Sequence, residues 1–114
     1  MTSEEKIEKI RELADDAKAE RIEVLPVAEK TVIADYLIVC SGNSDVHVRS
    51  IADRIAEKMR ELKSRPTHVE GESSGWVLMD FGDVLCNVMR EEQRQFYDLE
   101  SLWKQMPKRD DLET

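Results

Sequence analysis

Apolar side chains recur at helical spacing in two long stretches of the chain. The first follows Thr2–Glu5, which matches a capping box, and runs to about Glu20. The second follows Ser44, a suitable N-cap, and ends before Pro66, because proline disfavours helical backbone in the preceding residue. The two apolar stripes are Ile7, Ile10, Leu13, Ala14 and Ala17, and then Val48, Ile51, Ile55, Met59 and Leu62. This pattern predicts two long amphipathic helices.

Three shorter segments have the pattern of β-strands. Ile22–Val24 alternates between apolar and polar residues and predicts a strand that ends near Pro26. Tyr36–Cys40 is apolar at every position, which indicates a central strand that is buried on both faces. Thr67–Glu70 predicts a short strand, followed by a loop at 71–75. Together with the helices, these strands predict an α/β fold.

A β-hairpin is predicted around Gly82-Asp83, a dipeptide typical of two-residue hairpin turns. This turn pairs Phe81 with Val84, and the pairing continues outward along both strands. Successive strand residues point to opposite faces of a sheet. One face is then wholly apolar and must lie against the helices: Val77, Met79, Phe81, Val84, Cys86 and Val88.

The opposite face of the hairpin is also unusually apolar. It carries Trp76, Leu78, Asp80, Leu85, Asn87 and Met89. A sheet face in contact with water is mostly polar, so two interpretations remain open. Either another segment of the chain, such as Phe96–Trp103, covers this face, or part of it is exposed for a binding partner.

The C-terminal part of the chain predicts shorter helices and a tail. Glu91 to about Tyr97 has a helical pattern, and Asp98–Trp103 predicts a further turn or two. Residues 104–114 are polar and contain Pro107, which predicts a flexible tail. The chain is therefore expected to form a single domain over residues 1–103.

Composition and charge narrow the possible partners. No apolar run is long enough to cross a membrane, and the N-terminus lacks the apolar stretch of a secretory signal, so a cytoplasmic location is expected. The net charge is −8, which disfavours binding to phosphate backbones and argues against direct sequence-specific contact with nucleic acid. A basic protein is the favoured partner.

The sequence offers few groups for catalysis or metal binding. Cys40 and Cys86 lie inside apolar strands and are expected to be free buried thiols. His47 and His68 have no neighbouring ligands at metal-site spacing, and a hydrogen-bonding role is expected for them. We therefore expect no metal, no cofactor and no catalytic residue.

Three sequence blocks resemble the ribosomal silencing factor (RsfS, or Iojap) family. The first is Asp35–Ser44 with His47-Val48 and Ile51–Asp53, the second is Glu70-Gly71 with Trp76–Val84, and the third is Arg94–Trp103. They follow one another in order over about residues 31–103. One departure is Asn87, where members of that family often carry a histidine.

This resemblance implies a mixed β-sheet with flanking helices, similar in topology to nucleotidyltransferases but without their catalytic carboxylates. It implies a translation repressor that binds large-subunit ribosomal protein fourteen and sterically blocks joining of the ribosomal subunits, and that is a homodimer when free. Carried over by position, its partner-facing residues are Trp76, Leu78, Asp80, Arg94, Tyr97, Leu99 and Trp103, to which the exposed hairpin face adds Leu85 and Met89.

The main alternative is a residual nucleotide-handling enzyme. Ser41–Ser44 precedes a helix, and such a turn can bind a phosphate through its backbone amides. The enzyme would use Ser44 together with Asp80 and Asp83. A turn with an N-cap explains the same residues more simply.

Overall fold

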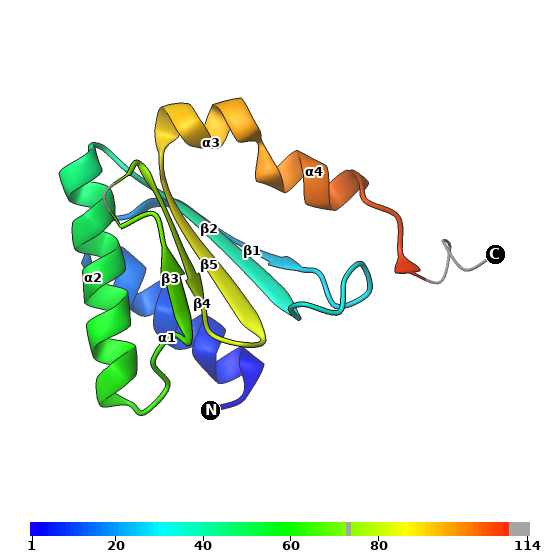
Figure 1. Cartoon of the computed structure of the whole chain (residues 1–114), viewed down its shortest axis with the longest axis horizontal. Coiled ribbons are helices and arrows are strands. Elements are labelled where there is room, and N and C mark those ends of the chain that lie inside the picture. Colours follow the sequence, from blue (N-terminus) through cyan, green and yellow to red (C-terminus); the bar gives the residue numbers. More distant parts are fainter. Residues whose placement is uncertain (73, 110–114) are drawn as a thin grey trace.

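The described residues form one mixed β-sheet with helices on both faces. The computed structural model describes residues 1–72 and 74–109. The strands are β1 (Glu20–Pro26), β2 (Tyr36–Gly42), β3 (His68–Glu70), β4 (Trp76–Asp80) and β5 (Val84–Arg90). Their order across the sheet is β1-β2-β5-β4-β3 (Figure 1). Only β2 and β5 are parallel, and the other neighbours are antiparallel.

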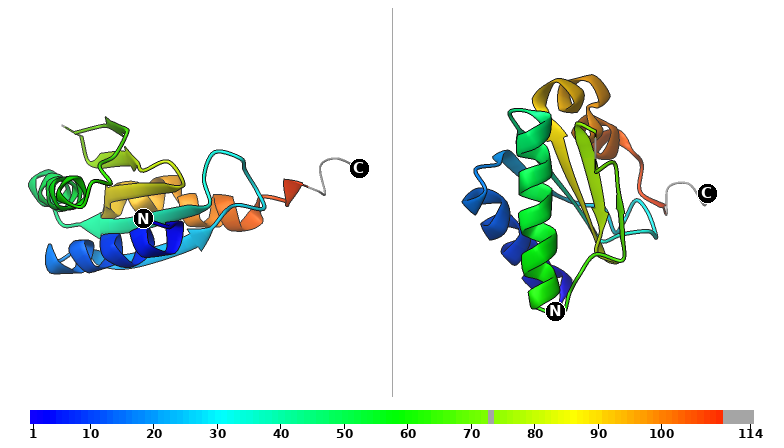
Figure 2. Two further views of the ribbon diagram at one scale, coloured as in Figure 1. Left: turned by 90° about the horizontal axis from the view of Figure 1, so that it is seen from below. Right: turned by 60° about the vertical axis from the view of Figure 1, so that its left-hand side comes forward.

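Helices α1 (Ser3–Asp16) and α2 (Asp45–Glu61) cover one face of this sheet, and α3 (Glu91–Tyr97) and α4 (Leu99–Gln105) lie on its other side (Figure 2). The two long helices and their N-caps, Thr2 and Ser44, confirm the prediction from sequence. The first helix is shorter than predicted. Lys18 adopts a left-handed conformation with φ of 65°, which ends the helix and turns the chain into β1.

The strand predictions are confirmed in place, with β1 and β2 longer than predicted and β3 one residue shorter. Tyr36–Cys40 lies in β2, which is central between β1 and β5. The predicted strand at Ile22–Val24 is the middle of the longer β1. A strand apolar on both faces needs neighbours on both edges and cover on both sides, and this position supplies them.

The hairpin has the register that its turn predicted. Leu78 lies opposite Asn87, Met79 opposite Cys86, and the Phe81 N–H donates to the Val84 carbonyl at 2.9 Å. Gly82 has φ of +92°, which L side chains rarely adopt, so glycine suits this turn. All six residues assigned to the apolar face are buried in the core with α1 and α2.

The two thiols are part of that core. Cys40 and Cys86 are both buried and free. Burial raises the pKa of the Cys40 thiol to about 12 and raises that of Cys86 well above its ordinary value. Neither forms a reactive thiolate at neutral pH, so both act as small apolar residues.

The other face of the sheet is covered only in part. Leu99 and Trp103 of α4 pack against a second cluster of Val27, Ala34, Leu37, Val39 and Met89. These residues come from β2, β5 and the loop after β1, so α4 covers that side of the sheet (Figure 1). Leu78 of β4 does not belong to this cluster. Another segment of the chain, α4, therefore covers the part of the apolar face around Met89, whereas the part around Leu78 is not covered by α4.

The predicted tail begins against the body of the protein. Lys108 pairs with Glu29 at 3.1 Å, and the Arg109 N–H donates to the Glu29 carbonyl. The described part of the tail is thus held by the loop after β1, and residues 110–114 lie outside the described residues. No helix in the described ranges has the length and apolar composition to cross a membrane.

Asp83, in the hairpin turn, anchors the start of α1. Its carboxylate accepts hydrogen bonds from Lys6 Nζ at 2.7 Å and from Ser3 Oγ. Partial burial raises the pKa of this carboxyl, but the hydrogen bonds from Lys6, Ser3 and the backbone, together with the charge of Lys6, hold it below its ordinary value of 3.8. The carboxylate form therefore stabilises the folded chain.

Asp83→Asn is expected to lower the free energy of unfolding by about 1 kcal/mol at neutral pH. A carboxyl with a lowered folded pKa stabilises the fold above its unfolded pKa, and this contribution disappears as the pH falls through the folded pKa. Urea unfolding at neutral pH and at about pH 3 should therefore show a smaller loss on acidification in the variant than in the wild type. An equal loss in both proteins would contradict this role.

Candidate protein-binding face

The open part of the second sheet face is a hollow beside β4. It has a volume of about 420 Å³ and is lined by Glu70, Gly71, Ser74, Trp76, Leu78, Gln93 and Tyr97. These residues come from β3, β4, the loop between them, and α3. Trp76, Leu78 and Tyr97, all predicted as partner-facing, thus meet at one place. We call Trp76, Leu78, Phe96 and Tyr97 together the aromatic face.

Trp76 is held in a fixed orientation. Its indole N–H donates to Asn87 Oδ1 at 2.9 Å, and its ring centroid lies 5.0 Å from that of Tyr97. Asn87 is buried and in turn approaches the Ile38 carbonyl with its amide nitrogen at 3.5 Å. Asn87 had no assigned role from sequence, and the structure shows that it orients the indole. These two contacts therefore hold the tryptophan side chain in one orientation beside the hollow.

Phe96 extends this apolar surface and was missed in the sequence. Its ring packs edge-on against Tyr97 with centroids 5.0 Å apart. Phe96 is 74% exposed and Tyr97 is 53% exposed, so neither ring is buried by the described chain. The adjacent aromatic pair in a short surface helix was the signal that could have identified Phe96. Large exposed aromatic residues are typical of protein interfaces.

Acidic groups border the aromatic face. Glu70 of β3 lies opposite Leu78, and Asp80 of β4 lies opposite both His68 and Leu85. Asp80 Oδ1 accepts a hydrogen bond from the Gly82 N–H at 2.8 Å, which fixes its carboxylate at the turn. Asp83, in the same turn, points instead toward Ser3 and Lys6 of α1. Glu70, whose Oε1 lies 2.7 Å from His68 Nε2, and Asp80 therefore place negative charge at the border of the aromatic face.

Two residues predicted as partner-facing are buried. Met89 has no exposed surface, and Arg94 is 2% exposed. Met89 lies on the predicted sheet face, but α4 covers that position. Neither side chain is available for surface contact in this structure. Leu85, Leu99 and Trp103 are half-buried at the same cluster, because Leu99 and Trp103 of α4 pack onto the sheet there.

Arg94 connects the two short helices to the sheet. Its Nε donates to Glu100 Oε1 at 2.9 Å, and Nη1 donates to Ser41 Oγ at 2.8 Å. Nη2 lies 3.8 Å from Glu23 Oε2. Between the helices, Asp98 adopts a left-handed conformation and accepts a hydrogen bond from the Ser101 N–H. Arg94 thus positions α3 and α4, and with them Tyr97 and Phe96.

The residues of the enzyme alternative are far apart. Ser44 follows the carboxyl end of β2 and caps α2 by accepting from the His47 N–H. Asp80 and Asp83 lie at the opposite end of the sheet, where β2 and β5 begin. In the described part of the chain, no group of three or more metal-binding side chains comes together. The geometry gives no support to a site that combines these three residues.

His47 has the structural role expected from sequence. Its Nδ1 accepts from the Asn43 N–H at 2.9 Å, and its Nε2 lies 3.0 Å from the Ala17 carbonyl. Because Nδ1 accepts, the hydrogen is placed on Nε2, which donates to Ala17. The ring therefore joins the start of α2 to the end of α1.

The fold is that of a small α/β domain with a mixed five-stranded sheet. Its candidate site is a partly open surface with aromatic side chains and not a closed cavity. A family model described as "Ribosomal silencing factor during starvation" matches residues 1–114. The chain therefore belongs to the ribosomal silencing factor (RsfS) family, and the resemblance seen in its sequence is confirmed. The family's name denotes a regulatory factor of the ribosome.

Relatives with this name cover most of the chain. The chain is 34% identical over 108 residues to ribosomal silencing factor RsfS of Halalkalibacterium halodurans, covering 94% of this chain and 92% of the relative. It is 38% identical over 94 residues to that of Bacillus subtilis, covering 82% and 80%. A crystal structure of a Chromobacterium violaceum protein matches with a TM-score of 0.88 at 34% identity, covering 95% of this chain and 92% of that one. The mixed α/β fold is thus confirmed, and likeness to nucleotidyltransferases stays a prediction.

Proposed function

We propose that this protein represses translation by binding the large ribosomal subunit through ribosomal protein fourteen, which blocks joining of the small subunit. The observation that carries this proposal is the aromatic face, where Trp76, Leu78 and Tyr97 meet around an open hollow. Family membership supports silencing of the ribosome as the biological role. A mouse relative, 29% identical over 101 residues, is named for assembly of the mitochondrial ribosomal large subunit.

The aromatic face has the properties of a binding hot spot. Tryptophan and tyrosine are enriched among residues that dominate binding energy, especially where they are already ordered in the free protein. Trp76 is ordered by Asn87 and Tyr97. Glu70 and Asp80 at the rim and the net charge of −8 favour encounter with a basic ribosomal protein. The apolar centre supplies affinity and the rim supplies orientation.

The proposed mechanism is steric and requires no reaction. The protein measures 45 × 33 × 20 Å along its principal axes. Even the shortest of these dimensions far exceeds the separation of about 4 Å at which two protein surfaces make contact. A domain of this size on the subunit interface therefore holds the two subunits apart. The proposed location is the cytoplasm, and the homodimer implied by the resemblance stays a prediction.

Subunit joining tests this proposal directly. Purified large and small subunits are mixed with increasing amounts of the protein, and joined ribosomes are measured by sucrose-gradient sedimentation. We expect the joined fraction to fall as the large subunits become occupied. Leu62→Glu is the control, because Leu62 is 44% exposed at the end of α2, on the other side of the sheet, and this variant should still block joining. Full occupancy of large subunits with unchanged joining would refute the steric mechanism.

A further inference from the structure

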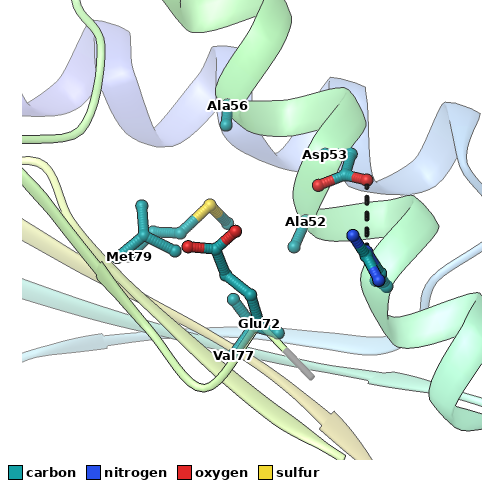
Figure 3. A pocket seen from close by; sticks show the side chains of 8 residues that line it. Ala52, Asp53, Ala56, Glu72, Val77 and Met79 are labelled. Carbon is teal, nitrogen blue, oxygen red and sulfur yellow. Dashed lines mark ion pairs between the residues drawn. The ribbon is translucent and has the colours of Figure 1, made fainter. Parts of the chain in front are cut away.

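A second hollow lies on the side of the sheet that α1 and α2 cover, between α2 and strands β3 and β4. It has a volume of about 90 Å³ and is lined by Arg49, Ala52, Asp53, Ala56, Val69, Glu72, Val77 and Met79 (Figure 3). Its floor is apolar, because Val77 and Met79 belong to the core and Ala52 and Ala56 are too short to fill the space. The volume is roughly three times the share of one water molecule in liquid water, enough for a short aliphatic chain.

Carboxylates stand at the mouth of this hollow. Asp53 approaches from α2, and Glu72 reaches over the floor from the loop after β3 (Figure 3). Asp53 has a weak exposed pair with Arg49 at 4.0 Å. Glu72 makes no hydrogen bond or ion pair with any part of the chain that the structure describes. Arg49 also lines the hollow and offsets the charge of Asp53, so Glu72 supplies the excess negative charge above the apolar floor.

We propose that this hollow binds a lysine side chain of a partner protein, presented on an extended segment beside β3. A lysine has an aliphatic stem for the floor and an ammonium group for Asp53 and Glu72. A wholly apolar side chain would leave Glu72 unpaired, and an acidic one would face two carboxylates against the single guanidinium of Arg49.

The surroundings of the hollow fit such a segment. β3 is the last strand of the sheet, so its outer edge has backbone groups without a strand partner in the described chain. A neighbouring hollow, lined by residues that include Glu57, Arg60 and Arg65, shares Asp53 and Ala56 with the first. The two hollows thus continue along α2 next to this edge. An added strand would pair with β3 and direct alternate side chains toward α2.

A titration followed by methyl NMR tests the proposal. The probes are Nα-acetyl-lysine methylamide and its norleucine analogue, which has a similar stem without the ammonium group. We expect saturable shifts confined to methyl groups around the hollow, at Ala52, Ala56 and Val69, with the lysine probe and far weaker shifts with norleucine. Because the probe is a small amide, the result does not depend on ribosome binding.

Three variants distinguish binding in this hollow from general attraction to an acidic protein. Glu72→Gln should weaken binding of the lysine probe several-fold, whereas Glu4→Gln, which removes the same charge from α1, should leave it unchanged. Ala56→Leu fills the hollow and should abolish the shifts, with folding checked by thermal unfolding. Equal responses to lysine and norleucine, or equal losses in Glu72→Gln and Glu4→Gln, would overturn the proposal. Tighter binding of spermidine with no response to the lysine probe would also overturn it.

Discussion

Arg94→Met is expected to lower the free energy of unfolding by about 3 kcal/mol, one of the largest effects of any single substitution in this chain. Arg94 is 2% exposed, and its guanidinium is bound by Glu100 and Ser41. Methionine preserves much of the aliphatic stem but leaves the Glu100 carboxylate, whose side chain is only 14% exposed, without its cation. An unpaired charge in such a position is costly.

A nearby arginine provides the control for this prediction. Arg90 pairs with Glu92 at 2.7 Å and with Asp45 at 3.5 Å, but its side chain is 35% exposed. Arg90→Met should therefore cost less than about 1 kcal/mol, as is usual for surface ion pairs. Urea unfolding of both variants gives the comparison. If the two substitutions cost the same, burial of Arg94 has no special importance.

A second substitution identifies the cause of the Arg94 effect. If the loss arises from an unpaired carboxylate, Glu100→Gln in the Arg94→Met background should restore about 1 kcal/mol or more. If it arises from lost packing, Glu100→Gln should restore nothing. The double variant therefore distinguishes the two explanations through the same unfolding measurement.

Leu78→Glu is expected to have the largest effect on ribosome binding. Leu78 lines the open hollow next to Trp76, and it is not part of the cluster beneath α4. The substitution should cost about 2–4 kcal/mol of binding free energy, or roughly 30- to 1,000-fold in Kd, because it removes an apolar contact from the centre of the proposed interface. It also places a carboxylate where the partner would exclude water.

Co-sedimentation with large subunits measures this effect. Leu62→Glu introduces the same charge at another exposed leucine and should bind like the wild type. Thermal unfolding of both variants checks that the fold is intact, since Leu78 is only half-buried. Undiminished binding of Leu78→Glu would show that the aromatic face is not the contact surface, even if the protein still blocks subunit joining.

Local sequence patterns determined most of the secondary structure. The helix around Ile51 and Ile55 follows from apolar spacing and from Ser44 as N-cap. The hairpin register follows from Gly82, because a two-residue turn leaves one way to pair Phe81 with Val84. These features depend on residues close together in the chain, so they could be predicted without knowing the rest of the fold.

The composition of the candidate site was predicted better than the exposure of its members. Trp76, Leu78 and Tyr97 were assigned from a strand pattern and a family resemblance, and the structure brings them together. Met89 and Arg94 were assigned in the same way but are buried. Alternation along a strand shows which face a side chain occupies. It does not show which part of that face a later helix covers.

By itself, the sequence determined the helices, the hairpin, an excess of apolar side chains on one sheet face, and the negative charge that favours a basic partner. Only the tertiary structure decided how that apolar face is divided. Helix α4 covers Met89, and Arg94 anchors α3 and α4 to Ser41 of β2. This leaves Leu78 open on β4 and Trp76 half-buried at the edge of the cluster under α4. The physical reason is that such cover depends on tertiary contacts such as that of Arg94 with Ser41, 53 positions away, and a local pattern contains no information about them.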